Sequence, residues 1–381
     1  MLHKLAWYQL VTEKRRLLAA LAGIAFAVLL QLMQFGFREA MFVSATLLHR
    51  QFHADLILVS PLYEYVAATG SFPQRRLYQA LGLSDVESVA PVYVGFAPFK
   101  NPETHADRQI VVIGFDPDDV VLDIPSVIQN AKYLKVPDAA LFDQRSRPDF
   151  GPIPREFHRT HAVITEVAGR RTTIGGLFEL GVSFAGNGNI ILSDSSFRSI
   201  FHRSEDVINF GLVNLKPGVD LPAVQLTLTR LLTPEVKVFT RQQLIELEQI
   251  HWDKNTPTGF IFTMGMIVGL MVGAVIVYQI LYTDVTDHLG EYATLKAMGY
   301  TDRALYLVVL EEALMLSVCG FPLGFALAEA LYKVARNYTL LPIEMTAARA
   351  LVVLAMTVGM SCAAGLLAMR KLRTADPAEV F

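Results

Sequence analysis

The chain has 381 residues, of which 52% are hydrophobic and only 18% charged. This composition excludes an ordinary soluble protein and indicates that part of the chain lies in lipid. The formal net charge is −3 and lysine and arginine form no dense block, so nucleic acid is a poor partner.

The first predicted membrane span covers residues 17–36, with Gln31 and Gln34 as its strongly polar members. It is longer than the apolar core of a signal peptide, and we expect it to be retained as a span. Three further apolar stretches are long enough to cross a bilayer: residues 260–282, 304–331 and 350–369. The sequence therefore predicts an α-helical membrane protein with four transmembrane helices.

Lysine and arginine near the span ends predict the orientation, because they are enriched on the cytoplasmic side. One side would carry Lys4, Lys14, Arg15, Arg16, Lys296, Arg303, Arg370, Lys371 and Arg373. The opposite short loop would carry Lys333, Arg336 and Arg349. Both termini and the loop between spans two and three are therefore expected in the cytoplasm.

The long connection between spans one and two is predicted to be a folded α+β domain on the outer side. Short strand-like runs alternate with turn sequences, including ADLILVS, RQIVVIGF, NIILS and INFGLVNL. INFGLVNL, LPAVQLTLTRLL and VKVFT follow each other as a β-α-β unit. From Arg241 the pattern becomes helical and leads toward span two, interrupted at Thr256-Pro257-Thr258. The expected divisions are 1–37, 38–255, 256–283, 284–303 and 304–381.

Patterns typical of catalytic or metal sites are weak. The sequence has no phosphate-binding loop, since no Gly-Lys pair occurs, so ATP would not bind in that way. Ser183 follows Gly181 as in a nucleophile elbow, but Ala185 stands where the final glycine would be, and Ser183 is interpreted as structural. No catalytic residue and no metal site are expected, although two histidine pairs have ligand-like spacing: His49/His53 and His158/His161. The span carboxylates are expected to be interfacial or paired inside a bundle: Glu311, Glu312 and Glu329.

Span two carries a stripe of small residues, Gly265, Gly269 and Gly273, that predicts close helix packing. Its partner could be another span of the same chain or a second copy of the chain. Span three contains Gly320, Pro322 and Gly324, which are expected to bend or loosen it.

The charged segment between spans two and three, DVTDHLGEYATLKAMGY, predicts a helix of about three turns with Asp287 as N-cap and Gly299 after its end. One face would lie against lipid headgroups: Leu289, Tyr292, Ala293 and Lys296. The opposite face carries Asp287, Glu291, Thr294, Leu295 and Met298. Because this face would expose Leu295 and Met298 beside carboxylates, it is interpreted as a protein docking site. The alternative is an ordinary interfacial helix.

The sequence also resembles known families. GEYATLKAMGYTDRAL and the following EEA resemble the coupling segment and third span of FtsX/MacB-type permeases of ABC transporters. LAWYQL, RRLLAALAGIAFAVLLQLMQFGFREA, GLFELGVSFAGNGNIILSD and RKLRTADPAEVF are similar to the DevC family of that class.

This resemblance implies a homodimeric permease of the bacterial inner membrane, with a periplasmic domain made of a porter-like part and a mostly β part. ATP and Mg²⁺ would bind a separate ATPase subunit, with no cofactor on this chain. A periplasmic adaptor and an outer-membrane exit duct would complete a tripartite pump. The resemblance assigns ATPase contact and helix geometry to Glu291, Leu295, Lys296 and Gly299, and the docking face adds Thr294 and Met298.

The cargo implied by the resemblance is a lipid-like or amphiphilic molecule, for example a glycolipid. ATP-driven motion of the coupling helices would open and close the periplasmic domains and expel it outward. The main alternative is an FtsX-like mechanotransmitter that controls a periplasmic partner without transport. An extractor of lipoproteins and a membrane-anchored enzyme are further alternatives.

Overall fold

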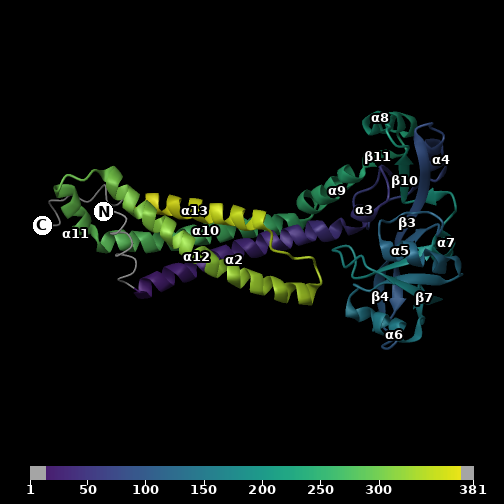
Figure 1. Ribbon diagram of the computed structural model, residues 1–381, viewed down its shortest axis with the longest axis horizontal. Helices are drawn as coiled ribbons and strands as arrows, with labels where there is room; N and C mark the ends of the chain where they lie inside the picture. Colours follow the sequence, from purple (N-terminus) through teal and green to yellow (C-terminus); the bar gives the residue numbers. More distant parts are fainter. Residues whose placement is uncertain (1–13, 370–381) are drawn as a thin grey trace. The chain divides into compact units, whose positions relative to one another are not determined.

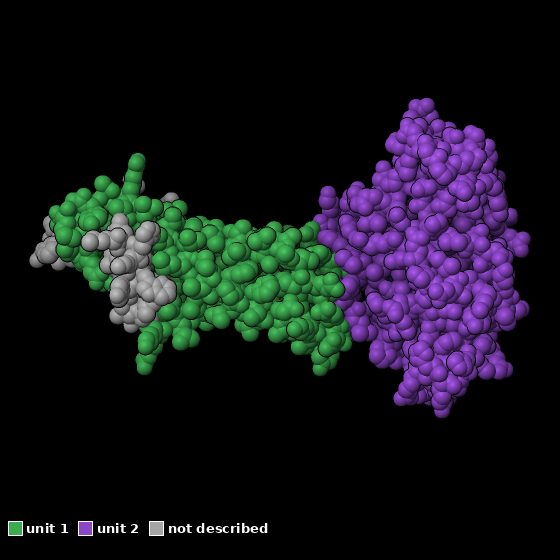
Figure 2. Space-filling model, in the orientation of Figure 1, with its two compact units in different colours: residues 1–40, 257–338, 343–381 green, residues 41–256, 339–342 purple. Residues whose placement is uncertain are grey.

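The computed structural model describes residues 14–369. It consists of two compact units (Figure 2). The helical unit comprises residues 1–40, 257–338 and 343–381, and the sheet unit comprises residues 41–256 and 339–342. Several positions used above lie outside the described residues: Lys4, Arg370, Lys371, Arg373 and the stretches LAWYQL and RKLRTADPAEVF.

Four helices among the described residues are long and apolar enough to cross a membrane: α2 (Lys14–Ala45), α10 (Pro257–Asp287), α12 (Asp302–Thr339) and α13 (Ala347–Ala368). Figure 1 shows them as long neighbouring rods. A short helix, α11 (Leu289–Ala297), follows α10. The four predicted spans are confirmed.

Glycines bring α10 and α12 close to α2. A Cβ atom on Gly324 would lie 2.5 Å from the carbonyl oxygen of Ala25, and one on Gly273 would lie 2.7 Å from the Cβ of Ala27. The other members of the α10 stripe also face α2: Gly265 lies against Gln34 and Gly269 against Leu30 and Gln31. The stripe therefore packs within the chain. The approach is too close for a side chain at Gly273, whereas a Cβ at Gly269 would make ordinary contacts.

Gly320, Pro322 and Gly324 do not end the helix of span three. Helix α12 continues without interruption through Pro322, and Gly320 packs against Ile24 of α2. Both glycines of this stretch therefore serve helix packing.

A buried polar cluster ties α2, α12 and α13 together. Arg349, in the first turn of α13, donates to the Tyr332 hydroxyl (3.2 Å) and the Glu344 carbonyl oxygen (2.6 Å) and forms an ion pair with Glu39. The Tyr332 hydroxyl in turn donates to the Leu32 carbonyl oxygen. Arg349, which the sequence placed in a loop, is almost fully buried inside the bundle and fixes three of its helices.

The sheet unit holds one nine-stranded sheet in the order β11-β1-β10-β3-β4-β8-β5-β7-β6, plus a two-stranded pair β2-β9. The strands are β1 (Leu56–Val59), β2 (Phe72–Pro73), β3 (Val86–Lys100), β4 (Asp107–Phe115), β5 (Ala139–Asp143), β6 (Val163–Val167), β7 (Arg170–Phe178), β8 (Asn189–Ser193), β9 (Val207–Ile208), β10 (Phe210–Leu215) and β11 (Lys237–Thr240). The helices are α3 (Leu47–Gln51), α4 (Arg75–Leu81), α5 (Pro125–Asn130), α6 (Ile153–Thr160), α7 (Asp194–Phe201), α8 (Leu221–Leu232) and α9 (Arg241–Ile250), with short 3₁₀ turns at Ala131–Lys135 and Pro148–Phe150.

The 15-residue strand β3 belongs to both parts of the sheet unit. Residues 86–92 pair with β10, whereas residues 93–100 pair with β4. Phe99 and Lys100 also pair with β6, so β3, β4, β8, β5, β7 and β6 close on themselves. The predicted β-α-β unit is confirmed as β10-α8-β11, with β1 inserted antiparallel between its strands.

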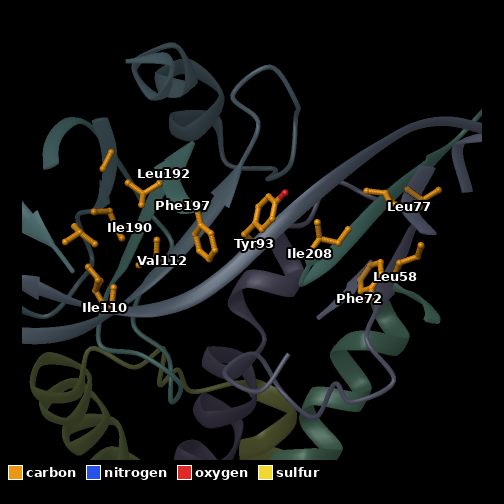
Figure 3. Close-up of a cluster of buried hydrophobic side chains, with 14 of the residues drawn as sticks. Leu58, Phe72, Leu77, Tyr93, Ile110, Val112, Ile190, Leu192, Phe197 and Ile208 are labelled. Atoms are coloured by element: carbon orange, nitrogen blue, oxygen red, sulfur yellow. The ribbon is translucent and has the colours of Figure 1, made fainter. Parts of the chain in front are cut away.

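Both faces of the sheet are apolar and covered, so successive residues of a strand enter different cores. Tyr93 lies in one core and its neighbours Val92 and Val94 in the other. Figure 3 shows the first core. Tyr93 and Phe197 lie in its middle, with Ile190 and Leu192 on one side and Ile208 and Phe72 on the other. One continuous packing layer therefore joins the two parts of the sheet unit.

The loop after β7 is held by a single buried carboxylate. Asp143 accepts hydrogen bonds from the backbone N–H groups of Leu180 (3.1 Å) and Gly181 (2.8 Å) and from Nδ2 of Asn189 (2.8 Å). In the same loop the Ser183 hydroxyl accepts from the N–H groups of Ala185 and Gly186, which is a structural role.

We expect Asp143→Ala to destabilise the sheet unit by about 2–4 kcal/mol, because it leaves several buried donors without an acceptor. Asp143→Asn retains one acceptor oxygen and should cost less. Urea unfolding of the full chain in detergent measures both, and equal midpoints for Asp143→Ala and the wild type would contradict this role.

A second buried network joins α3, the loop after β1, and α9. Nε2 of His49 lies 2.7 Å from the Tyr63 hydroxyl, which donates to Oε2 of Glu248 at 2.6 Å. His49 and Glu248 are fully buried. His49 therefore faces Tyr63, while His53 instead pairs with Asp123.

Burial lowers the pKa of His49 from 6.5 to about 3, because the apolar surroundings disfavour the charged imidazolium. A lowered folded-state pKa stabilises the fold above pH 6.5, and this contribution is lost as the pH falls toward 3. We expect the wild type to lose unfolding free energy relative to His49→Phe as the pH falls from 6.5 to 3.5. Urea titrations at several pH values measure this difference, and a difference independent of pH would contradict it.

Candidate functional site at the short helix α11

The boundary between α10 and α11 lies one residue later than the sequence indicates. Helix α10 continues through Asp287, and His288 is the N-cap position of α11. Asp287 is therefore not the N-cap of α11. Its carboxylate forms an ion pair with Arg16 of α2 instead.

The end of α11 is fixed by its backbone. Gly299 has a positive φ of 94° and donates its N–H to the Lys296 carbonyl oxygen (3.0 Å), while the Tyr300 N–H donates to that of Leu295 (3.1 Å). These two bonds form a Schellman motif, which requires the left-handed backbone that glycine adopts most easily. The predicted role of Gly299 in ending the helix is confirmed.

The inner face of α11 lies in a protein seat and not on lipid headgroups. Tyr292 is fully buried and Ala293 nearly so. The seat is formed by Val285 of α10, Leu305 and Val309 of α12, and Met369. The headgroup interpretation of Tyr292 and Ala293 is therefore wrong, because periodicity identifies an apolar face but not what covers it.

Two of the predicted contact residues also help to hold the helix. Leu295 is half-buried against the same apolar cluster, so its expected full exposure is wrong. The ammonium group of Lys296 lies 2.8 Å from the carboxylate of Asp302, in the first turn of α12. Leu295 and Lys296 thus connect α11 to its neighbours.

Charged side chains surround the seat. Arg16 lies 3.5 Å from Asp284, and His288 lies 3.7 Å from the same carboxylate. Glu312 of α12 is fully buried and interacts with Asp284 and Tyr292. Burial beside these carboxylates raises the pKa of Tyr292 well above its usual value, so its hydroxyl stays neutral.

The outer face of α11 is exposed. It includes Glu291, Thr294 and Met298, and the turn adds Gly299 and Tyr300. Met298 is 64% exposed and Tyr300 is 40% exposed. A rigidly seated helix therefore presents two large apolar side chains beside a carboxylate, which is the composition of a small docking surface.

Sequence reasoning missed the seat. The sequence predicts Glu312 as a carboxylate in a span and Arg16 only as an orientation signal, and it predicts no contact for Asp284. Charged residues near the ends of spans indicate that they need polar partners. The sequence does not show which spans lie next to one another, so it cannot identify those partners.

Tyr292 tests the seat directly. Its hydroxyl has no hydrogen-bond partner among residues 14–369, so Tyr292→Phe should leave α11 in place. Tyr292→Ala removes a buried ring and should cost about 3–5 kcal/mol locally. We expect amide hydrogen exchange across 289–299 to be at least about tenfold faster in Tyr292→Ala and unchanged in Tyr292→Phe. Equal exchange in all three proteins would exclude the seat.

Comparison with protein families adds an independent finding. Residues 263–377 match the model of the FtsX-like permease C-terminal family. This range contains all of α11, the seat residues and the exposed outer face. No curated protein matches the chain.

Solved structures resemble the sheet unit weakly. The periplasmic region of MacB from Actinobacillus actinomycetemcomitans is 10% identical, with a TM-score of 0.36, over 52% of this chain and 94% of that one. The extracellular domain of YknZ from Gram-positive bacteria is 14% identical, with a TM-score of 0.34, over 49% and 99%. A domain of a putative permease from Porphyromonas gingivalis is 15% identical, with a TM-score of 0.32, over 50% and 92%.

Proposed function

We propose, from the FtsX-like permease C-terminal domain that lies within residues 263–377, that this chain is the membrane subunit of an ABC transporter whose ATPase is a separate chain. The observation that carries the proposal is the seated helix α11 with its exposed outer face. An ATPase needs a contact surface that is firmly attached to the membrane helices. Helix α11 offers such a surface, because its inner face is buried against α10 and α12 and its outer face is exposed.

The docking surface consists of Glu291, Thr294 and Met298, with Gly299 and Tyr300 at its edge. Leu295 and Lys296 support this surface from within, since one packs on the seat and the other pairs with Asp302. The proposed ATPase contact therefore falls on fewer residues than the sequence pattern indicated.

A force on α11 would pass to two long helices. Tyr292 packs against residues of both α10 and α12, and Lys296 adds an ion pair to α12. Because these contacts are buried or short-range, α11 cannot shift without displacing its neighbours. ATP-driven closure of the partner would thus move α10 and α12 together.

The finer proposal is a homodimeric efflux permease of the bacterial inner membrane, with both termini and α11 in the cytoplasm. A periplasmic adaptor and an outer-membrane duct would receive a lipid-like or amphiphilic cargo. The lysine and arginine distribution supports the orientation. Since the glycine stripe of α10 lies against α2, a dimer contact would use another face.

Expulsion from the outer side is supported by the interior of the bundle. Among its described residues, Ser317 and Thr357 are buried and bond carbonyl groups of their own helices. Gln31 is fully buried beside Gly269. The buried charges form two separate groups, because Glu312 beside Asp284 and Tyr332 beside Arg349 lie twenty residues apart along α12. We therefore place the path of the cargo outside the bundle.

We expect the double substitution Glu291→Lys with Met298→Glu to reduce capture of the partner ATPase by at least about tenfold, because both residues lie on the outer face. Co-purification in detergent with the ABC ATPase encoded beside this gene, with ATP turnover as a second readout, measures the effect. Lys333→Glu on α12 is the matched charge-reversal control and should retain the ATPase.

Leu295→Asp distinguishes residues that would touch the ATPase from residues that hold α11 on its seat. It should lose the ATPase and also accelerate hydrogen exchange across α11, whereas the outer-face double variant should lose only the ATPase. If the wild type retains no ATPase in any nucleotide state, the docking assignment fails.

A further inference from the structure

The carboxylate of Glu248 lies where the chain leaves the sheet unit. It sits near the end of α9 and is followed by a π-helical turn, His251–Asn255. Three donors reach it: the Tyr63 hydroxyl at 2.6 Å, the Val66 N–H at 3.2 Å and Nε1–H of Trp252 at 3.2 Å. Trp252 belongs to the π-helical turn, so this carboxylate connects the turn to the sheet unit.

Among residues 14–369, no lysine or arginine forms an ion pair with this buried carboxylate. His49 is 3.8 Å from Oε2 of Glu248, but its lowered pKa keeps it neutral. The other charged or titratable groups on the elements around α9 and the turn are Arg50, Glu64, Lys237, Arg241, Glu246, His251, Asp253 and Lys254. Glu246 is exposed and accepts from Gln242. Arg50 bonds Thr46, Lys237 bonds the Pro61 carbonyl oxygen, and Arg241 bonds Phe52 and Asp123. Glu64 is exposed, and His251 stacks on Tyr65.

The carboxyl group can exist in two forms near neutral pH. Burial raises the pKa of Glu248 from 4.5 to about 7, although the hydrogen bonds from Tyr63, Val66 and Trp252 oppose this shift. As an ion it accepts from all three donors. In the ionised form Nε2–H of His49 donates to the Tyr63 oxygen. When the carboxyl group is protonated on Oε2, it would donate to the Tyr63 oxygen. The Tyr63 hydroxyl would then turn to donate to Nε2 of His49, which requires the imidazole proton to move from Nε2 to Nδ1.

The two forms bind Trp252 with different strength. Hydrogen bonds to a charged acceptor are roughly twice as strong as those to a neutral one. The ionised carboxylate therefore holds the indole and the Val66 N–H firmly, and the protonated group holds them weakly. π-Helical turns are rare and are frequent at functional sites. The bond from Nε1–H of Trp252 to Glu248 ties this turn to α9.

We propose that Glu248 is a protonation-controlled latch that holds the π-helical turn His251–Asn255 through Trp252 when ionised and releases it when protonated. The proposal goes beyond the ATPase docking at α11 and does not depend on it. It makes the order of the turn that precedes α10 sensitive to the pH of the compartment around the sheet unit.

The test uses Trp252 as its own reporter. The chain has two tryptophans, so Trp7→Phe leaves Trp252 alone. Full-length protein in detergent is titrated from pH 5.5 to 8.5 while the emission maximum is recorded, and hydrogen exchange is measured across 249–256. We expect emission to shift to longer wavelength as the pH falls, with one midpoint near 7. The protection factors across 249–256, which correct for the slower intrinsic exchange at low pH, should fall with the same midpoint.

Three variants decide the assignment. Glu248→Gln, a neutral isostere, should show the released state at every pH and lose the titration. Tyr63→Phe removes a donor that favours the ionised carboxylate and should move the midpoint to higher pH. His251→Gln is the control for quenching by the neighbouring imidazole and should leave the midpoint unchanged.

The outcomes separate this latch from the proposed function. A titration that persists in Glu248→Gln, disappears in His251→Gln, or is absent from the parent protein overturns the latch. Because none of these readouts involves the ATPase, failure to capture an ATPase leaves the result standing, and failure of the latch leaves the docking site untouched.

Discussion

A charge buried among membrane helices must find a partner within the protein, because lipid supplies no water to solvate it. The helical unit meets this constraint at two places. Arg349 joins Glu39, Tyr332 and the backbone of Glu344, while Arg16 joins Asp284 and Asp287. Each cluster connects helices that are far apart in the sequence, so the need to neutralise charge also fixes the bundle.

Close helix packing at glycines also holds the bundle together. Gly273 of α10 and Gly324 of α12 both lie against α2, at distances where any side chain would collide. Helix α2 is therefore the element that α10 and α12 share. Helix α11 makes a second link between α10 and α12, because Tyr292 packs against both and Lys296 pairs with Asp302 of α12. Helices α10 and α12 are thus connected through α2 and through α11.

Much of the fold follows from the sequence because long periodic patterns are strong. The four spans, the strand runs ADLILVS and NIILS, and the glycine that ends α11 all appear where their patterns indicate. Closure of the second sheet part depends on Phe99 and Lys100 pairing with β6, which no local pattern encodes. The same limit applies to Tyr292. Periodicity identifies its apolar face, but the surface that covers this face comes from α10, α12 and Met369, which the fold brings together.

Local rules also fail where two of them compete. Asp287 is a good N-cap residue, yet α10 continues through it because its carboxylate pairs with Arg16, and His288 takes the cap position although its side chain forms no cap hydrogen bond. A propensity of about 1 kcal/mol is readily outweighed by a charge-assisted contact at the edge of a bundle.

Between the start of α9 and the end of α10, the chain departs from α-helical geometry at one place. The capping box of Thr240 and Gln243 begins α9, the π-helical turn follows Ile250, and Thr256 is extended before Pro257 opens α10. Motion carried along α10 would meet its least regular backbone here, where the ladder of i to i+4 hydrogen bonds is broken. Glu248 is the residue that supports this point from inside the sheet unit, through Trp252. The latch proposed for Glu248 therefore acts on the stretch of irregular backbone that lies between α9 and α10 in the sequence.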